Sequence, residues 1–378
     1  MKKICIFLFT IIFLLSFPIL AFANEVEDEI TSSIENELEE FKSSIPKEII
    51  DYLPEGIFEG DYSLLLDEGL DEKSLLSYII DYFFAGLGTV IKSFSGILVL
   101  ILISSIFEML GSSFSNTTLS SAFTLASGLC VALTVFNLCY SLASTVSTYI
   151  QTICSVMTSF APIMTTLQIM GGKITSATIS NASIVLFISV VDGFLVVFML
   201  PLVNLCLMFS CIKALGGIEF GAISKLVRNT FTSVTVFVMS VFMFIFSFKN
   251  VLSQGADSLS VKTARFAISS FVPIVGASIN DALRTVSSSL SIIKNSCGVV
   301  AIICIALIML PITIYIFLNK VSFGLLASIS KTLHCEKQAV ILEEADSLCS
   351  YMLTLVCTTC VLFIFAITIF IKTSLEVV

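Results

Sequence analysis

The sequence predicts an all-α polytopic membrane protein, with six to eight transmembrane or re-entrant helices after a signal peptide and a short acidic extracytoplasmic helical arm. The 378 residues are 57% hydrophobic and only 12% charged, whereas about 25% of the residues of a soluble domain are charged. So few charges cannot cover a water-facing surface. We therefore expect lipid to surround most of the chain.

Charge divides the chain into parts. Residues 24–82 carry 18 acidic and 3 basic side chains, whereas residues 83–378 carry 10 acidic and 14 basic ones. We expect a signal peptide at 1–23, an acidic extracytoplasmic arm at 24–82 and a helical transmembrane domain at 83–378.

The first 23 residues have the features of a secretory signal. Lys2 and Lys3 precede an apolar stretch, and Ala21-Phe22-Ala23 forms a small-x-small cleavage site. The alternative is an uncleaved N-terminal anchor. Both interpretations translocate the acidic arm out of the cytoplasm.

The arm contains one amphipathic helix. Apolar residues recur three or four positions apart, as expected for one helix face, at Val26, Ile30, Ile34, Leu38, Phe41 and Ile45. Acidic residues fill the other faces, and Pro46 ends the pattern. An acidic helix binds anionic lipid poorly, so we expect it to pack against its own neighbours or against a partner protein. Residues 53–72 read as turns.

Six stretches have the length and hydrophobicity of a membrane span; they are residues 93–110, 121–143, 182–211, 231–248, 297–318 and 351–371. An interfacial helix at 74–92 is expected to lead into the first of them. Residues 150–170 and 266–283 are apolar but rich in Ser and Thr. Each contains a proline, so each is either a full span or a re-entrant half-helix.

Basic residues favour one topology. If 150–170 only dips into the membrane, the loop 212–230 is cytoplasmic together with Lys213, Lys225 and Arg228. If 150–170 crosses fully, these charges lie outside. Because basic loops prefer the cytoplasm, we favour the dip.

The sequence contains no recognisable enzyme motif. Nucleotide-binding, dinucleotide-binding, zinc-protease and serine-hydrolase signatures are all absent. The only histidine, His334, is in a polar loop, and no basic cluster suggests nucleic acid. We predict no enzymatic activity, no catalytic residue, no cofactor and no metal site.

A few polar and hinge positions are candidates for function. Asp192 lies inside the longest apolar run, where a carboxylate costs about 2.5–3.5 kcal/mol. It is expected either to line a polar path or to make a structural hydrogen bond to Ser or Thr. Lys262 and Arg265 are expected to anchor the next segment at the interface. Two F-x-P-I pieces, which contain Pro162 and Pro273, lie near glycines such as Gly276, a pattern seen in transporters with inverted repeats.

Three runs resemble one protein family. KTARFAISSFVPIVGASINDA (262–282) and IKNSCG (293–298) are similar to the signature region of the stage III sporulation protein AE family, and MTSFAPIMTTLQIMGG (157–172) is similar to its F-x-P segment. The resemblance implies a multi-pass protein of endospore-forming bacteria, made in the mother cell. It would lie in the mother-cell membrane around the forespore, with its arm in the intermembrane space.

The resemblance also implies a function. The chain would be a membrane subunit of a multiprotein channel or secretion-like complex that links mother cell and forespore and is needed for endospore development. Its partners would be the other membrane proteins of the stage III sporulation operon, a cytoplasmic secretion-type ATPase, a forespore-side protein and membrane lipid, without nucleic acid. The alternative is a free-standing secondary transporter or permease with a midplane site near Asp192.

Overall fold

The computed structural model describes residues 36–50, 72–113, 117–171, 173–216, 221–271 and 276–372. The described residues are helical and contain no strand. The helices are α2 (Lys47–Ile50), α4 (Glu72–Ser113), α5 (Thr117–Met170), α6 (Ile174–Val190), the π-helix η2 (Val191–Val196), α7 (Val197–Gly216), α8 (Gly221–Phe271), α9 (Gly276–Thr332) and α10 (Glu336–Lys372). The predicted all-α class is confirmed.

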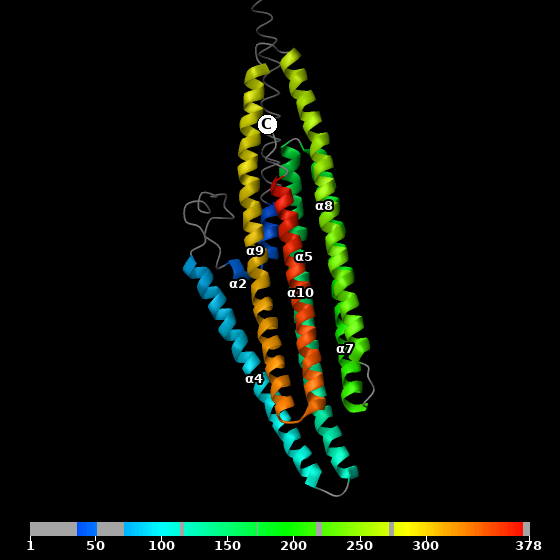
Figure 1. The fold of residues 1–378 in the computed structure, drawn as a ribbon. Coiled ribbons are helices and arrows are strands. Elements are labelled where there is room, and N and C mark those ends of the chain that lie inside the picture. The colour runs from blue at the N-terminus through cyan, green and yellow to red at the C-terminus, as the bar shows by residue number, and fades with distance from the viewer. Residues whose placement is uncertain are drawn as a thin grey trace, which may run out of the picture.

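The long helices form an elongated antiparallel bundle (Figure 1). Helices α6, η2 and α7 follow one another without a break and form one continuous helix with a π-helical segment in its middle. The connections from α4 to α5, from α7 to α8 and from α9 to α10 all lie at one end, which we call the turn end (Figure 1). The connection from α5 to α6 and the end of α10 lie toward the other end, which we call the arm end.

Six helices in the described part of the chain are long and apolar enough to cross a membrane. Five of the six predicted spans lie within α4, α5, α8, α9 and α10. The span predicted at 182–211 runs across α6, η2 and α7, and only its part up to Gly193 belongs to a candidate membrane helix. The predicted re-entrant dip at 150–170 is wrong, because these residues continue the helix that contains 121–143. The described parts of the segment 212–230 are the end of α7 and the start of α8, and both lie at the turn end (Figure 1).

Two further predictions are corrected. Residues 266–283 are neither a span nor a half-helix, because they straddle the end of α8 and the start of α9. Residues 74–92 are not a separate interfacial helix but the first half of α4. This half packs on α9, as shown by Gly86, where an added Cβ would lie 3.4 Å from Leu318.

Helices α9 and α10 form the centre of the bundle. Small buried residues on both helices, among them Ala301, Cys304, Cys349 and Ala366, allow close approach. Larger rings fill the gaps to the outer helices, as where Phe187 of α6 meets Phe363 of α10 with ring centroids 5.0 Å apart. Since lipid is as apolar as these side chains, close packing rather than water exclusion holds such helices together.

Pro311 would leave one carbonyl of α9 without a partner. Proline has no N–H, so the carbonyl of Leu307, four residues earlier, loses its helical hydrogen bond. The hydroxyl of Tyr78 on α4 donates to this oxygen at 3.0 Å. Tyr78 is 1% exposed, so the bond also satisfies a hydroxyl that is buried among apolar side chains. The first half of α4 is thus fixed to the middle of α9.

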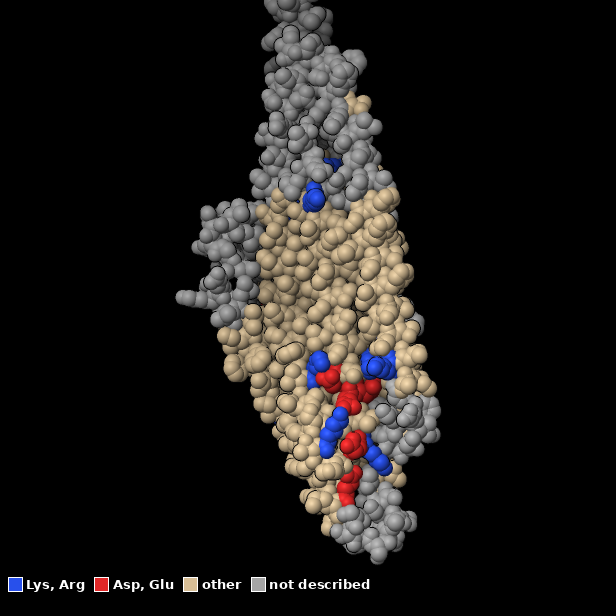
Figure 2. Space-filling view, viewed as in Figure 1, with Lys and Arg blue, Asp and Glu red and all other residues tan. Residues whose placement is uncertain are grey.

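An uncharged band crosses the bundle. Residues 295–319 of α9 and 347–371 of α10 contain no charged side chain, and each stretch is about 38 Å long at 1.5 Å per residue. Figure 2 shows this band between a cluster of both charge signs toward the turn end and basic side chains toward the arm end. The band matches the thickness of a bilayer with its interfaces, and we take it as the membrane-embedded layer.

The hairpin of α4 and α5 extends beyond this band. The thiol of Cys335, in the connection between α9 and α10, lies 4.0 Å from the carbonyl of Ile101, and Gln338 donates to Ser127 at 3.4 Å. Residues on both sides of the α4–α5 connection therefore project past the α9–α10 turn (Figure 1). The large exposed side chains of this projection are apolar and include Ile106, Met109 and Leu125.

Gly298 tests the packing of α9 against α10. A Cβ at this position would overlap with Ile371, with only 2.5 Å to its Cδ1 atom. We expect Gly298→Ala to lower the free energy of unfolding by about 1–3 kcal/mol through overpacking, measured by denaturation in mixed micelles. Gly96→Ala is the control, because nothing lies within 4 Å of its added Cβ. Equal effects of the two changes, or no relief of Gly298→Ala by Ile371→Ala, would contradict the packing described.

Candidate functional site

Helix α5 carries a polar stripe where it crosses the uncharged band. Cys139 lies close enough to Cys349 of α10 for electrostatic interaction, and Met164 is near Gly298 at the other edge of the band. Between them the exposed positions follow spacings of three and four residues; they are Ser141, Ser144, Thr148, Gln151, Ser155, Thr158 and Pro162, with Tyr140 as the remaining exposed residue. We call this surface the α5 face.

Asp192 lies beside the middle of this face. It is the second residue of η2, its side chain is exposed, and its Oδ1 accepts a hydrogen bond from Gln151 Nε2 at 3.5 Å. Gln151 is midway between Cys139 and Met164, so this pair lies near the centre of the band. A π-helical turn within an α-helix is often found at a functional site.

The acidic arm lies beside the arm-end half of the α5 face. Glu37 accepts a hydrogen bond from Thr166 at 3.2 Å, and Phe41 packs on Phe160 with ring centroids 5.5 Å apart. Burial raises the pKa of Glu37, while the bond from Thr166 opposes the rise. Residues 36–44 are helical and precede Pro46, which confirms the described half of the predicted amphipathic helix. The residues of that helix before 36 lie outside the described chain.

The described part of the arm up to Ile50 borders a cavity at the middle of the band. A space of about 260 Å³ lies between the arm, α4, α5 and α9, and it is lined by Pro46, Glu48, Ile49, Tyr78, Tyr82, Thr148, Tyr149, Thr152, Ile308 and Pro311. The Tyr82 hydroxyl donates to Glu48 at 3.0 Å. A carboxylate therefore lies level with Ile308, in the uncharged stretch of α9.

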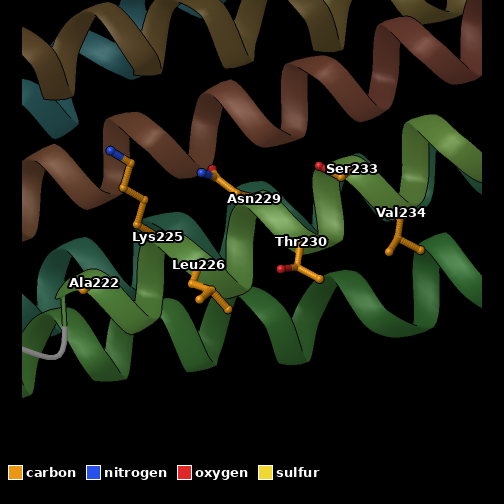
Figure 3. Close-up of a pocket in the computed structure, with 7 residues that line it drawn as sticks. All are labelled: Ala222, Lys225, Leu226, Asn229, Thr230, Ser233 and Val234. Carbon is orange, nitrogen blue, oxygen red and sulfur yellow. The ribbon is translucent and has the colours of Figure 1, made fainter.

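The outer face of α8 has the opposite character. Its large exposed side chains at the depth of the band are apolar, and Phe237 and Phe244 are each 68% exposed. The small polar residues Ser240 and Ser247 are also exposed there. Nearer the turn end, a shallow depression of about 570 Å³ is lined by seven residues that all come from α8 (Figure 3). A depression formed by one helix offers no converging groups, and we assign no ligand to it.

Ion pairs join three helices at the turn-end edge of the band. Arg228 of α8 contacts Glu344 of α10 at 2.5 Å, and Ser224 donates to the same carboxylate at 2.7 Å. Lys320 of α9 contacts Asp346 of α10 at 3.1 Å. Lys331 of α9 also pairs with Glu343 of α10. We call these residues the charged cluster, which Figure 2 shows on the surface.

The structure brings only some of the predicted site residues together. Asp192 and Pro162 both border the α5 face, and Pro162 lies inside a continuous α5 rather than at an interruption. Lys262 and Arg265 lie in α8, and Gly276 begins α9. The side chains of Lys262 and Arg265, and all of Pro273, lie outside the described part of the chain.

The sequence did not identify the partners of Asp192. Gln151 was missed because it is 41 residues away from Asp192. The polar residues between 141 and 158 recur at alternating three- and four-residue spacings, a pattern that indicates the polar helix face to which Gln151 belongs. No group of His, Cys, Asp or Glu that could hold a metal ion occurs among the described residues.

The charged cluster yields a test with an internal control. Glu344 and Arg228 are each 13% exposed as side chains, and removal of one partner of a buried pair costs about 3–5 kcal/mol. We expect Glu344→Gln to lower the free energy of unfolding by an amount near the low end of that range. Glu343→Gln breaks a pair about half exposed and should cost below about 1 kcal/mol. Equal losses in the two variants would show that the cluster does not hold α8 to α10.

Comparison with known proteins identifies the family. The family model described as stage III sporulation protein AE matches residues 64–374. The chain is 25% identical over 303 residues to the stage III sporulation protein AE of Bacillus subtilis (strain 168), which covers 75% of this chain and 73% of that protein. No solved structure matches. The chain therefore belongs to the stage III sporulation protein AE family.

Proposed function

We propose that the chain is a membrane subunit of a multiprotein channel or secretion-like complex that links the mother cell and the forespore. It acts in the mother-cell membrane around the forespore, with the acidic arm in the intermembrane space. Its partners are the other membrane proteins of the stage III operon, a cytoplasmic secretion-type ATPase and a forespore-side protein. Membership of the sporulation family supports the cellular role.

The observation that carries the proposal is the polar character of one side of the bundle at membrane depth. Asp192, Glu48 and the α5 face lie level with the uncharged stretches of α9 and α10. Carboxylates and amides facing lipid would cost several kcal/mol, whereas a surface covered by protein or water would not. A chain of this kind is stable in a membrane when further subunits complete it.

The arrangement of the ends agrees with this orientation. The start of α8, with Lys225 and Arg228, lies at the turn end, opposite the end beside which the arm packs. With the arm outside, the basic loop is cytoplasmic, as the positive-inside rule prefers. The charged cluster and the projecting α4–α5 hairpin then face the mother-cell cytoplasm, where an ATPase would act.

The alternative of a free-standing transporter has one supporting observation, the π-helix at Asp192. However, the inverted-repeat pattern required an interrupted segment at Pro162, and α5 is continuous there. The second F-x-P-I piece lies partly outside the described residues.

Affinity purification from sporulating cells tests the proposal. A tagged chain replaces the family member of an endospore-forming host, and the proteins that co-purify in mild detergent are identified. We expect the operon membrane proteins and the ATPase. Reversal of two exposed arm charges, Glu39→Lys with Glu40→Lys, should release partners that reach into the intermembrane space but retain the ATPase. Glu343→Gln serves as the control for altered charge elsewhere.

Asp192→Asn separates the two functions. A subunit that lines a wide polar path keeps a polar side chain at this position, so spore yield should fall only mildly. The proposal fails if the tagged chain purifies without the operon proteins, or if Asp192→Asn abolishes spore formation with unchanged abundance and partners. The latter result, together with solute uptake by liposomes that contain the chain alone, would establish the transporter.

A further inference from the structure

We propose that the α5 face, Asp192 and the arm form the wall of a water-filled groove that runs from the arm end to at least the middle of the membrane and admits hydrated cations. This inference deepens the proposed function, because it assigns the aqueous path of the complex to one face of this subunit. Only the destination of the groove depends on the proposed function, and the presence of the groove does not.

The polar stripe on α5 does not carry the inference alone. Serine and threonine in a membrane helix can satisfy their hydroxyls on their own backbone, and Thr148 and Thr158 do so with Ser144 and Cys154 at 3.2 and 2.7 Å. Such residues are tolerated against lipid. The amide of Gln151 and the carboxylate of Asp192 have no comparable solution within their own helices.

The arm provides independent evidence of water at this depth. Between Glu37, which contacts Thr166, and Glu48, which lines a cavity with Thr148, the arm descends along half of the membrane-embedded length of α5. Four charged side chains in this stretch are exposed; they are Glu39, Glu40, Lys42 and Lys47. Lys47 lies next to Glu48 near the centre of the band, where a charge would cost about 2.5–3.5 kcal/mol against hydrocarbon. Glu39, Glu40 and Lys42 lie nearer the arm-end edge, because Phe41 packs on Phe160. Lipid is therefore excluded from this side of the bundle.

The cavity at the foot of the arm extends the groove inward. Its volume of about 260 Å³ exceeds the roughly 30 Å³ share of one water molecule several times. Glu48 and the hydroxyls of Tyr82, Thr148 and Thr152 supply the polar partners that buried water needs. The space continues the hydrated surface from the arm to the depth of Asp192.

The described charges of the groove favour cations. The exposed carboxylates of Glu39, Glu40, Glu48 and Asp192 outnumber the ammonium groups of Lys42 and Lys47. A groove with low-dielectric walls concentrates ions of opposite sign. The opposite side of the bundle, with Phe237 and Phe244 exposed, presents the lipid surface.

Thiol accessibility tests the groove directly. Ser155→Cys is placed in a full-length chain whose 12 cysteines are replaced, and the protein is reconstituted in lipid nanodiscs. The probes are membrane-impermeant methanethiosulfonates, one with a trimethylammonium group and one with a sulfonate. Because only a hydrated thiolate reacts, we expect Ser155→Cys to react at least about 100-fold faster than the lipid-facing control Phe237→Cys. The cationic probe should react faster than the anionic one.

A second measurement uses the wild-type chain, in case removal of the cysteines impairs folding. A water-soluble carbodiimide with glycine ethyl ester converts accessible carboxylates to amides, and mass spectrometry locates them. We expect modification of Asp192 and of Glu39.

The results distinguish the inference from the function on which it rests. Modified Glu39 with unmodified Asp192, or a Ser155→Cys thiol as unreactive as Phe237→Cys, would overturn the groove and leave the complex intact. Loss of the partners in the purification described above would overturn the complex, while the groove would still be seen in the isolated chain. Equal rates for the two probes would overturn the preference for cations.

Discussion

The high free energy of a charge in hydrocarbon is the constraint on which this structure depends. Helices α9 and α10 each cross about 38 Å without a charged side chain, and ion pairs gather at the turn-end edge of that band, where water and headgroups begin. Because of the same cost, the charged side chains that do lie at the depth of the band need an explanation. Asp192 and Glu48 lie at mid-depth, and both belong to the side of the bundle where α5 shows polar residues. At that depth, the outer face of α8 exposes Phe237 and Phe244 and no charged side chain among its described residues. The bundle therefore has one side suited to lipid and one side that is not.

A second surface whose polarity does not match its surroundings lies beyond the band. The hairpin of α4 and α5 exposes Ile106, Met109 and Leu125 past the level at which the charged cluster begins. Apolar side chains outside the membrane and polar ones inside it are both favourable when other protein chains cover them, because each surface then meets a partner of its own polarity. Inside the bundle, by contrast, the Tyr78 hydroxyl satisfies the carbonyl left by Pro311. The chain is thus well ordered within its core and unfinished at two of its surfaces, which agrees with the role of a subunit.

Composition and periodicity predicted the fold class and five of the six spans, because hydrophobicity over about 20 residues is a local property. They did not predict which stretches share a helix. Residues 121–143 and 150–170 seemed separate, yet α5 runs through both and accommodates Pro162. Asp192 was found from its apolar surroundings alone. Its contacts were not predicted, because Gln151 and the arm come from distant positions in the sequence. Arg228 and Glu344 are likewise 116 residues apart. Which residues lie at the same depth depends on how the helices are aligned, and no local pattern in the sequence encodes that alignment.

The placement of the bilayer is the claim on which these conclusions depend most directly. A cryo-electron microscopy map of the chain in a lipid nanodisc would measure it. We expect lipid density along α8 from the level of the charged cluster to the level of Lys372, with an interruption along the α5 face. Lipid density centred instead on the projecting hairpin of α4 and α5, or continuous around Asp192, would contradict this placement.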